Sequence, residues 1–183
     1  MKVIQINGHK IEVLFSQSTI AKRVDEMAFE VAETNPQKLL AVPVLKGSFI
    51  FAADLLRSFH SADLLPEVDF MMLSSYRDKT TSSGQVEILR DIQTDVKGRD
   101  VLLIDDILES GRTLAFAKDL LMARGANRVM IAILLDKPKK RAVNIEAEFC
   151  GFECPDKFVV GYGMDMGHAY RQLPFVGAVI NAG

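Results

Sequence analysis

The sequence predicts an α/β domain in which a mainly parallel sheet is flanked by helices. Up to about residue 136, short apolar runs of strand length alternate with amphipathic segments of helix length. Gly, Pro, Asn and Ser punctuate the junctions between them. Strands joined by helices in this way run parallel, with right-handed crossovers. Such sheets bind ligands beyond the carboxyl ends of their strands, so we expect a site at that edge.

The first elements are a hairpin and a long helix. Asn7-Gly8 lies between alternating apolar residues and predicts a type I′ turn. A helix is expected from Ser18 to about Thr34, with Ser18 as its N-cap and Asn35-Pro36 at its end. Its expected buried stripe comprises Ile20, Val24, Met27, Ala28 and Val31.

The middle of the chain alternates strands with helices. We expect strands over 39–45, 68–74, 86–89, 101–104 and 129–135, and helices over 49–59 and from about 113 to 124. The polar segment 75–84 lacks periodicity and, with the strand after it, predicts a flap. After residue 138 the pattern favours short strands and turns.

Length and composition favour a single ordinary globular domain over 1–183. The chain is 49% hydrophobic and 25% charged, with a formal net charge of -2, which favours neither nucleic acid nor a membrane surface as a partner. The first residues lack the apolar core of a signal peptide, and no apolar run reaches membrane-spanning length. Cys150 and Cys154 have no histidine at a paired ligand spacing, so we expect two reduced thiols and a cytoplasmic location.

Polar segments follow three of the expected strands: Lys46-Gly47-Ser48, the stretch from Asp105 to Thr113, and Asp136-Lys137. Because the carboxyl ends of parallel strands meet at one edge, these segments should converge. Their convergence is the main argument from the residues for an active site.

The run Val101-Leu-Leu-Ile-Asp-Asp-Ile-Leu-Glu-Ser-Gly-Arg-Thr-Leu114 suits a sugar phosphate. Asp105 and Asp106 are acceptors for sugar hydroxyls or ligands for a divalent cation. Ser110, Gly111 and Thr113 offer small side chains and amides at a helix N-terminus, which suits a phosphate. Acids at a helix start could serve only the macrodipole, but this helix begins some seven residues later.

Other polar residues have ordinary structural readings when taken alone. Lys46-Gly47 could be a turn, Lys137 part of a solvated basic face, Phe158 a core residue and Arg171 a surface charge. Asp165, between two methionines and near two glycines, is unusual for a core strand.

Taken together, five ordered motifs between about Leu14 and Val179 resemble the purine phosphoribosyltransferases of the hypoxanthine-guanine type. They are the run 101–114, Leu45-Lys46-Gly47-Ser48, Ser74-Ser75-Tyr76, Leu134-Leu135-Asp136-Lys137, and the segment 155–165 (Pro-Asp-Lys-Phe-Val-Val-Gly-Tyr-Gly-Met-Asp). The resemblance implies the type I phosphoribosyltransferase fold: a core over about 36–140, a flap over about 74–90, and a hood built from about 1–20 and 141–183.

The resemblance also implies roles in binding phosphoribosyl diphosphate. Asp105 and Asp106 would bind the ribose hydroxyls, directly or through Mg²⁺, and the run Ser110, Gly111, Arg112 and Thr113 would hold the 5-phosphate. Lys46, Gly47 and Arg171 would bind the diphosphate, with the peptide before Gly47 often cis in relatives.

For the base, the resemblance implies that Lys137 donates to the 6-oxo group and that Phe158 stacks on the purine. Val159 would read the purine edge, and Asp165 would lie in the base site and bind a Mg²⁺ on the diphosphate. Ser75 and Tyr76 would close over the reacting centre.

Two positions depart from the family pattern. Glu109 stands where an Asp usually exchanges a proton with purine N7, and it also belongs to the phosphoribosyl diphosphate loop. Arg112 stands where Lys is frequent, and we expect its side chain to face solvent.

The implied function is Mg²⁺-dependent transfer of a phosphoribosyl group to hypoxanthine or guanine, giving IMP or GMP plus diphosphate, by a homodimer or homotetramer. Two alternatives stand beside it: a pyrimidine-regulatory RNA-binding homologue, and a ribose phosphate-binding module that has lost catalysis.

Overall fold

The computed structural model describes residues 2–75 and 85–180, apart from the side chain of Ser75. Its main sheet runs β6-β5-β3-β7-β8-β9, with β4 paired to β3. The bounds are β3 Leu40–Leu45, β4 Glu67–Val68, β5 Met71–Ser75, β6 Val86–Arg90, β7 Asp100–Leu108, β8 Arg128–Asp136 and β9 Phe149–Glu153. All pairings in it are parallel except that of β5 with β6.

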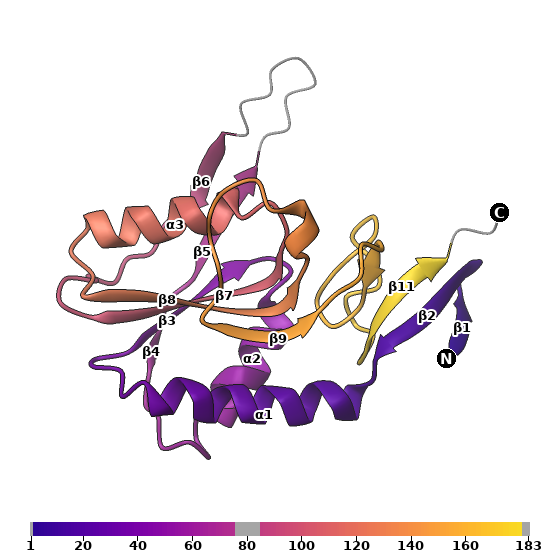
Figure 1. Cartoon of the computed structure of the whole chain (residues 1–183), viewed down its shortest axis with the longest axis horizontal. Coiled ribbons are helices and arrows are strands. Elements are labelled where there is room, and N and C mark those ends of the chain that lie inside the picture. Colours follow the sequence, from indigo (N-terminus) through magenta and orange to yellow (C-terminus); the bar gives the residue numbers. More distant parts are fainter. Residues whose placement is uncertain (1, 76–84, 181–183) are drawn as a thin grey trace.

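Helices cover both faces of this sheet. Figure 1 shows α3 (Arg112–Ala123) on one face, and α1 (Gln17–Glu33) and α2 (Phe49–Ser58) on the other. Each face has its own apolar core, and the predicted stripe of α1 is buried as a whole. A fully buried aliphatic side chain of this kind stabilises a fold by about 1.5–3 kcal/mol. Within the described residues, no helix is both long and apolar enough to cross a membrane.

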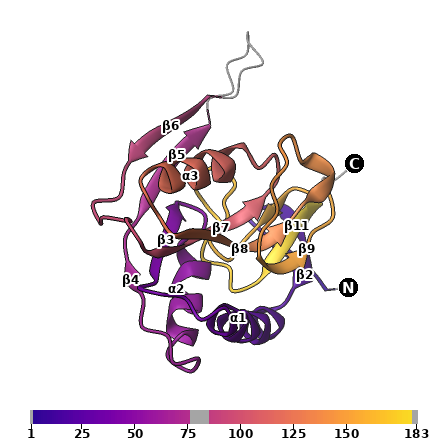
Figure 2. The ribbon, with the colours of Figure 1, turned by 60° about the vertical axis from the view of Figure 1, so that its left-hand side comes forward.

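Both ends of the chain build a second, antiparallel sheet, β1-β2-β11-β10, which we call the hood. Its strands are β1 Val3–Ile6, β2 His9–Phe15, β10 Val159–Val160 and β11 Val176–Ile180. Figures 1 and 2 show the hood strands β2 and β11 next to each other, although they come from opposite ends of the sequence. The predicted fold class, a mainly parallel sheet flanked by helices with a hood, is confirmed. Strands β5 and β6 at the base of the expected flap pair antiparallel, and residues 76–84 between them lie outside the described residues.

Local details agree with the sequence at most junctions. Asn7 (φ 48°) and Gly8 (φ 81°) both have positive φ, as a type I′ turn requires. The predicted N-cap of α1 is wrong: Ser16, not Ser18, accepts the Thr19 amide, at 3.2 Å. The helix therefore begins at Gln17, one residue before the expected start at Ser18.

Two strands differ from their predicted extents by more than one residue at an end. Strand β7 continues to Leu108 because its pairing with β8 continues to Asp136, so the acid pair lies within the strand rather than after it. The strand expected over 68–74 is observed as two strands, β4 and β5. Between them the Asp69 carboxylate accepts the amides of Gln93 and Thr94.

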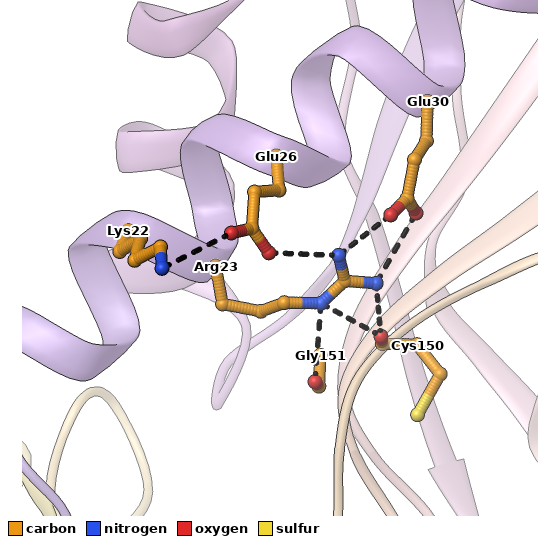
Figure 3. Close-up of polar contacts among 6 residues, drawn as sticks. All are labelled: Lys22, Arg23, Glu26, Glu30, Cys150 and Gly151. Carbon is orange, nitrogen blue, oxygen red and sulfur yellow. Dashed lines mark hydrogen bonds and ion pairs between the residues drawn. The ribbon is translucent and has the colours of Figure 1, made fainter.

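A partly buried arginine of α1, Arg23, holds this helix against the edge strand β9 (Figure 3). The Arg23 guanidinium donates to the carbonyls of Cys150 (2.8 Å) and Gly151 (3.2 Å), and it pairs with Glu30 at 2.6 Å. Carbonyls at the edge of a sheet need partners, and here α1 supplies them.

The thiols of Cys150 and Cys154 are free, and burial raises the pKa of each.

Candidate active site

A cavity of about 400 Å³ lies where β3, β7 and β8 end and the hood segment 158–165 covers them. Most predicted site residues line it together: Lys46, Gly47, Asp105, Asp106, Glu109, Ser110, Gly111, Thr113, Lys137, Phe158, Val159 and Asp165. The expected convergence of polar segments at the carboxyl edge of the sheet is therefore present.

Four predicted residues lie elsewhere. Arg112 is exposed at the first position of α3, with its side chain toward solvent as expected. Arg171 stands behind the cavity wall, where it donates to the Gly163 carbonyl (2.7 Å) and lies 3.1 Å from Asp165 Oδ1. Ser75 ends β5 at the base of the flap, and Tyr76 lies outside the described residues.

The two adjacent acids are held by backbone amides. The Asp106 amide donates to Asp105 Oδ1 (2.9 Å), and the Ile107 amide donates to Asp106 Oδ1 (3.0 Å). Burial, together with the neighbouring carboxylate, raises the pKa of Asp105 well above its usual range. Burial also raises the pKa of Asp106, although the charge of Arg171 opposes this rise.

The loop over residues 46–48 packs directly against this acid pair. A Cβ on Gly47 would overlap Asp106 Oδ2, and a Cβ on Gly163 would overlap the Gly47 carbonyl oxygen. The fully buried Ser48 hydroxyl donates to the Val44 carbonyl at 2.6 Å and ties the loop to β3. A cis peptide is present, but it joins Leu45 to Lys46, one bond before the position that the resemblance implied.

The loop between β7 and α3 lines the cavity with Ser110, Gly111 and Thr113. Gly111 is the N-cap of α3 with φ 80°, a conformation that favours glycine, and a Cβ there would overlap Ile145. The amides that begin α3 have no partner earlier in the helix, and the helix dipole favours an anion beside them. This arrangement suits a phosphate group.

Arg141 fastens the same loop from outside the cavity, and the sequence did not single it out. Its guanidinium donates to the carbonyls of Leu108 (3.0 Å) and Glu109 (2.7 Å) and to Asp136 Oδ1 (2.5 Å). In the sequence Arg141 closes a Lys-Pro-Lys-Lys-Arg run that looks like a solvated face. Its proximity to Asp136 in the chain was the only available signal.

Lys137 connects the loop between β7 and α3 to the chain that leads into the hood segment 158–165. It is 5% exposed, and its Nζ donates to Glu109 Oε1 (2.8 Å) and to the Lys157 carbonyl (2.9 Å). Phe158 is 57% exposed although it is aromatic and lines the cavity, whereas Val159 is buried in β10. A buried cation beside an open aromatic face suits a flat polar ring with an acceptor on its edge.

Known proteins resemble this chain over nearly its whole length. Residues 11–166 match the model of the phosphoribosyl transferase domain family. The chain is 46% identical to the hypoxanthine-guanine phosphoribosyltransferase of Bacillus subtilis, covering 93% of this chain and 94% of the relative. It is 41% identical to the hypoxanthine phosphoribosyltransferase of Escherichia coli, covering 94% and 97%.

Solved structures agree. A hypoxanthine phosphoribosyltransferase from Staphylococcus aureus superposes with a TM-score of 0.86 at 40% identity, covering 92% of this chain and 91% of that chain. Sequence, fold and the convergence of residues at the carboxyl edge thus lead to one conclusion: the chain belongs to the hypoxanthine(-guanine) phosphoribosyltransferases, a family of enzymes within the phosphoribosyltransferases.

Proposed function

We propose that the enzyme transfers the 5-phosphoribosyl group from phosphoribosyl diphosphate to hypoxanthine or guanine, giving IMP or GMP and diphosphate. The observation that carries this proposal is the two-part cavity. The acid pair and the start of α3 lie on one side, and a buried lysine with an open aromatic ring lies on the other.

In the ribose half, the Asp105 and Asp106 carboxylates accept from the ribose hydroxyls. Ser110, Gly111 and Thr113, with the Arg112 amide, hold the 5-phosphate at the helix N-terminus. Lys46 and the Gly47 backbone bind the diphosphate, and Arg171 supports them through Asp165 and the Gly163 carbonyl.

The donor set suits Mg²⁺. Asp105, Asp106 and Asp165 line the cavity and offer hard carboxylate oxygens. In the described residues no three ligating side chains form a ready-made metal cluster. Mg²⁺ is usually held by one or two carboxylates together with substrate phosphates and water, so these residues fit it. When bound, the ion would stabilise negative charge on the departing diphosphate.

In the base half, Lys137 selects an acceptor at the purine 6-position. An ammonium has three N–H groups, and Glu109 and the Lys157 carbonyl occupy two of them. The third is available for a 6-oxo group, which accepts, and not for a 6-amino group. Phe158 stacks on the purine, Val159 contacts its edge through the backbone, and Glu109 exchanges the N7 proton.

Ser75 and Tyr76 close over the reacting centre and exclude water that would hydrolyse the activated sugar. The enzyme works in the cytoplasm as a homodimer or homotetramer on small-molecule substrates, with no nucleic acid partner.

The test is release of diphosphate with each base offered separately, using the parent and Lys137→Ala. We expect turnover with hypoxanthine and guanine and none with adenine or uracil. Loss of the lysine should lower kcat/KM for hypoxanthine about a hundredfold, or about 2.7 kcal/mol. Lys139→Ala, which removes an exposed lysine two residues away, is the matched control.

Unchanged turnover of hypoxanthine by Lys137→Ala would refute the base pocket. Tight, salt-sensitive binding of an RNA hairpin without purine turnover would favour the regulatory alternative.

A further inference from the structure

The hood contains a buried carboxylate, Glu12, for which the proposed reaction has no role. Glu12 is 7% exposed in β2. It lies opposite Ala178 of β11, which in turn lies opposite Val159 of β10. Directly opposed residues of antiparallel strands share a face of the sheet. Glu12 is therefore in the same row as a residue that lines the base half of the cavity.

Lys157 joins Glu12 to the base half. Its Nζ lies 2.7 Å from Glu12 Oε2, and its carbonyl accepts the hydrogen bond from Lys137 Nζ at 2.9 Å. Phe158 follows it directly in the chain. One residue thus contacts the hood through its side chain and the base-selecting lysine through its backbone.

The two partners differ in exposure. The Glu12 side chain is 9% exposed, whereas the Lys157 side chain is 47% exposed. A buried carboxylate requires a counter-charge, and Lys157 is the one cation within 4.0 Å of it in the described part of the chain. A half-exposed lysine gains little stability from an ion pair, so the main consequence of the contact is where it holds the lysine.

We propose that Glu12 is a positioning residue for the purine. Through Lys157 it fixes the segment 157–159, and with it both the carbonyl that orients Lys137 and the ring of Phe158. A line of contacts then runs from Glu12 through Lys157 and Lys137 to Glu109, from the hood to the ribose loop. This inference rests on the proposed function, because its readout is binding of a 6-oxopurine.

The experiment compares KM for hypoxanthine with KM for phosphoribosyl diphosphate in four variants. Glu12→Gln removes the buried charge, Lys157→Met removes the ammonium but keeps the stem, and Lys157→Arg keeps a cation. Glu67→Gln serves as the control: it removes the ion pair between Glu67, an exposed residue of β4 in the main sheet, and Arg99.

We expect Glu12→Gln and Lys157→Met to raise KM for hypoxanthine about tenfold, equivalent to about 1.4 kcal/mol. KM for phosphoribosyl diphosphate and kcat should stay within about twofold of the parent, because Arg141 also holds the loop between β7 and α3 through the Glu109 carbonyl. Lys157→Arg and Glu67→Gln should behave as the parent. Thermal unfolding of each variant checks that it is folded.

An unchanged KM for hypoxanthine in Lys157→Met, or equal rises in both KM values, would overturn the inference. If Glu12→Gln does not fold, Lys157→Met decides alone. A parent without turnover of any 6-oxopurine would instead refute the proposed function. Crystal structures would then decide the inference, which fails if Lys137 Nζ still contacts the Lys157 carbonyl in Glu12→Gln.

Discussion

Strand β7 carries carboxylates at both ends, and the protein treats the two ends in opposite ways. At the amino end, Asp100 is 2% exposed and accepts from the Gln37 amide (2.9 Å), Asn127 Nδ2 (2.7 Å) and Arg128 Nη2 (2.7 Å). Burial alone would raise the pKa of Asp100, but these donors outweigh it and hold the pKa below its usual range.

At the carboxyl end, burial is the largest cause that raises the pKa values of Asp105 and Asp106, and the Asp106 charge adds to it at Asp105. The hydrogen bonds and the Arg171 charge that oppose the rise at Asp106 do not cancel it. Within the described residues, neither carboxylate has a cation within 4.0 Å. A structural carboxylate is satisfied by its own protein, whereas carboxylates with the binding role that we propose for Asp105 and Asp106 leave that task to the ligand. The same strand therefore stabilises the fold at one end and lowers stability at the other.

The largest effect should follow the loss of a carboxylate at the binding end. We expect Asp106→Asn to lower kcat/KM about a hundredfold or more, at least about 2.7 kcal/mol of transition-state stabilisation. The reason is that a neutral amide is a poorer ligand for a divalent cation and offers one acceptor oxygen where the carboxylate offers two. Steady-state release of diphosphate measures it, with Asp119→Asn on the exposed face of α3 as the control. Activity equal to the parent would remove Asp106 from the site.

The next effect should appear at the structural end, and in stability rather than activity. Asp100→Asn weakens the charge-assisted bonds to Arg128 and Asn127, which we expect to cost about 2 kcal/mol. For a chain of this size that lowers Tm by about 4–8 °C. Thermal unfolding measures the shift, and kcat/KM should stay within about twofold of the parent. A loss of activity without a loss of stability would contradict the division between the two ends.

The sequence indicated a role for the acids at the carboxyl end of β7 but not for Asp100 at its amino end. Two acids after an apolar run were conspicuous, and so was the loop with Gly111, because strand, turn and helix start are local signals. Asp100 was not conspicuous, since a single acid after Gly98-Arg99 resembles a turn. Its partners come from elsewhere in the chain, so only the folded sheet identifies its role.

The same reason explains the other omissions. Arg141 and Glu12 act through contacts made by tertiary structure, between residues that no periodicity relates. The order of the five motifs, by contrast, was enough to place nearly all the cavity residues. The extent of β7 was underestimated because acids are disfavoured in strand interiors, and pairing with β8 overrides that preference here.

The third prediction concerns pH and has a smaller magnitude. Asp105→Asn keeps the acceptor for the Asp106 amide but removes one of two repelling charges, so without Mg²⁺ or substrate it should stabilise the protein by about 0.5–2 kcal/mol at pH 7–8. The folded pKa of Asp105 lies above its unfolded value, so the parent loses stability as pH rises from the unfolded pKa, about 3.9, towards the folded pKa.

The gain in Asp105→Asn should therefore shrink as pH falls and vanish below about pH 4. Asp100 has the opposite sign, since its folded pKa is lowered. The stability it contributes is present above its unfolded pKa and is lost as pH falls. Urea unfolding across this range measures both differences. A gain in Asp105→Asn that does not depend on pH would show that repulsion is not its cause.

The smallest effect tests whether the two ends are independent. Asp105 lies five positions after Asp100 along the strand, about 16 Å away, and the two share no hydrogen-bond partner among the described residues. Substitutions this far apart usually add within about 0.3–0.5 kcal/mol. We therefore expect the Asp100→Asn, Asp105→Asn double variant to unfold with the summed free-energy change of the two single variants, one destabilising and one stabilising. A coupling energy above about 1 kcal/mol would show that β7 transmits strain from its structural end to the binding site.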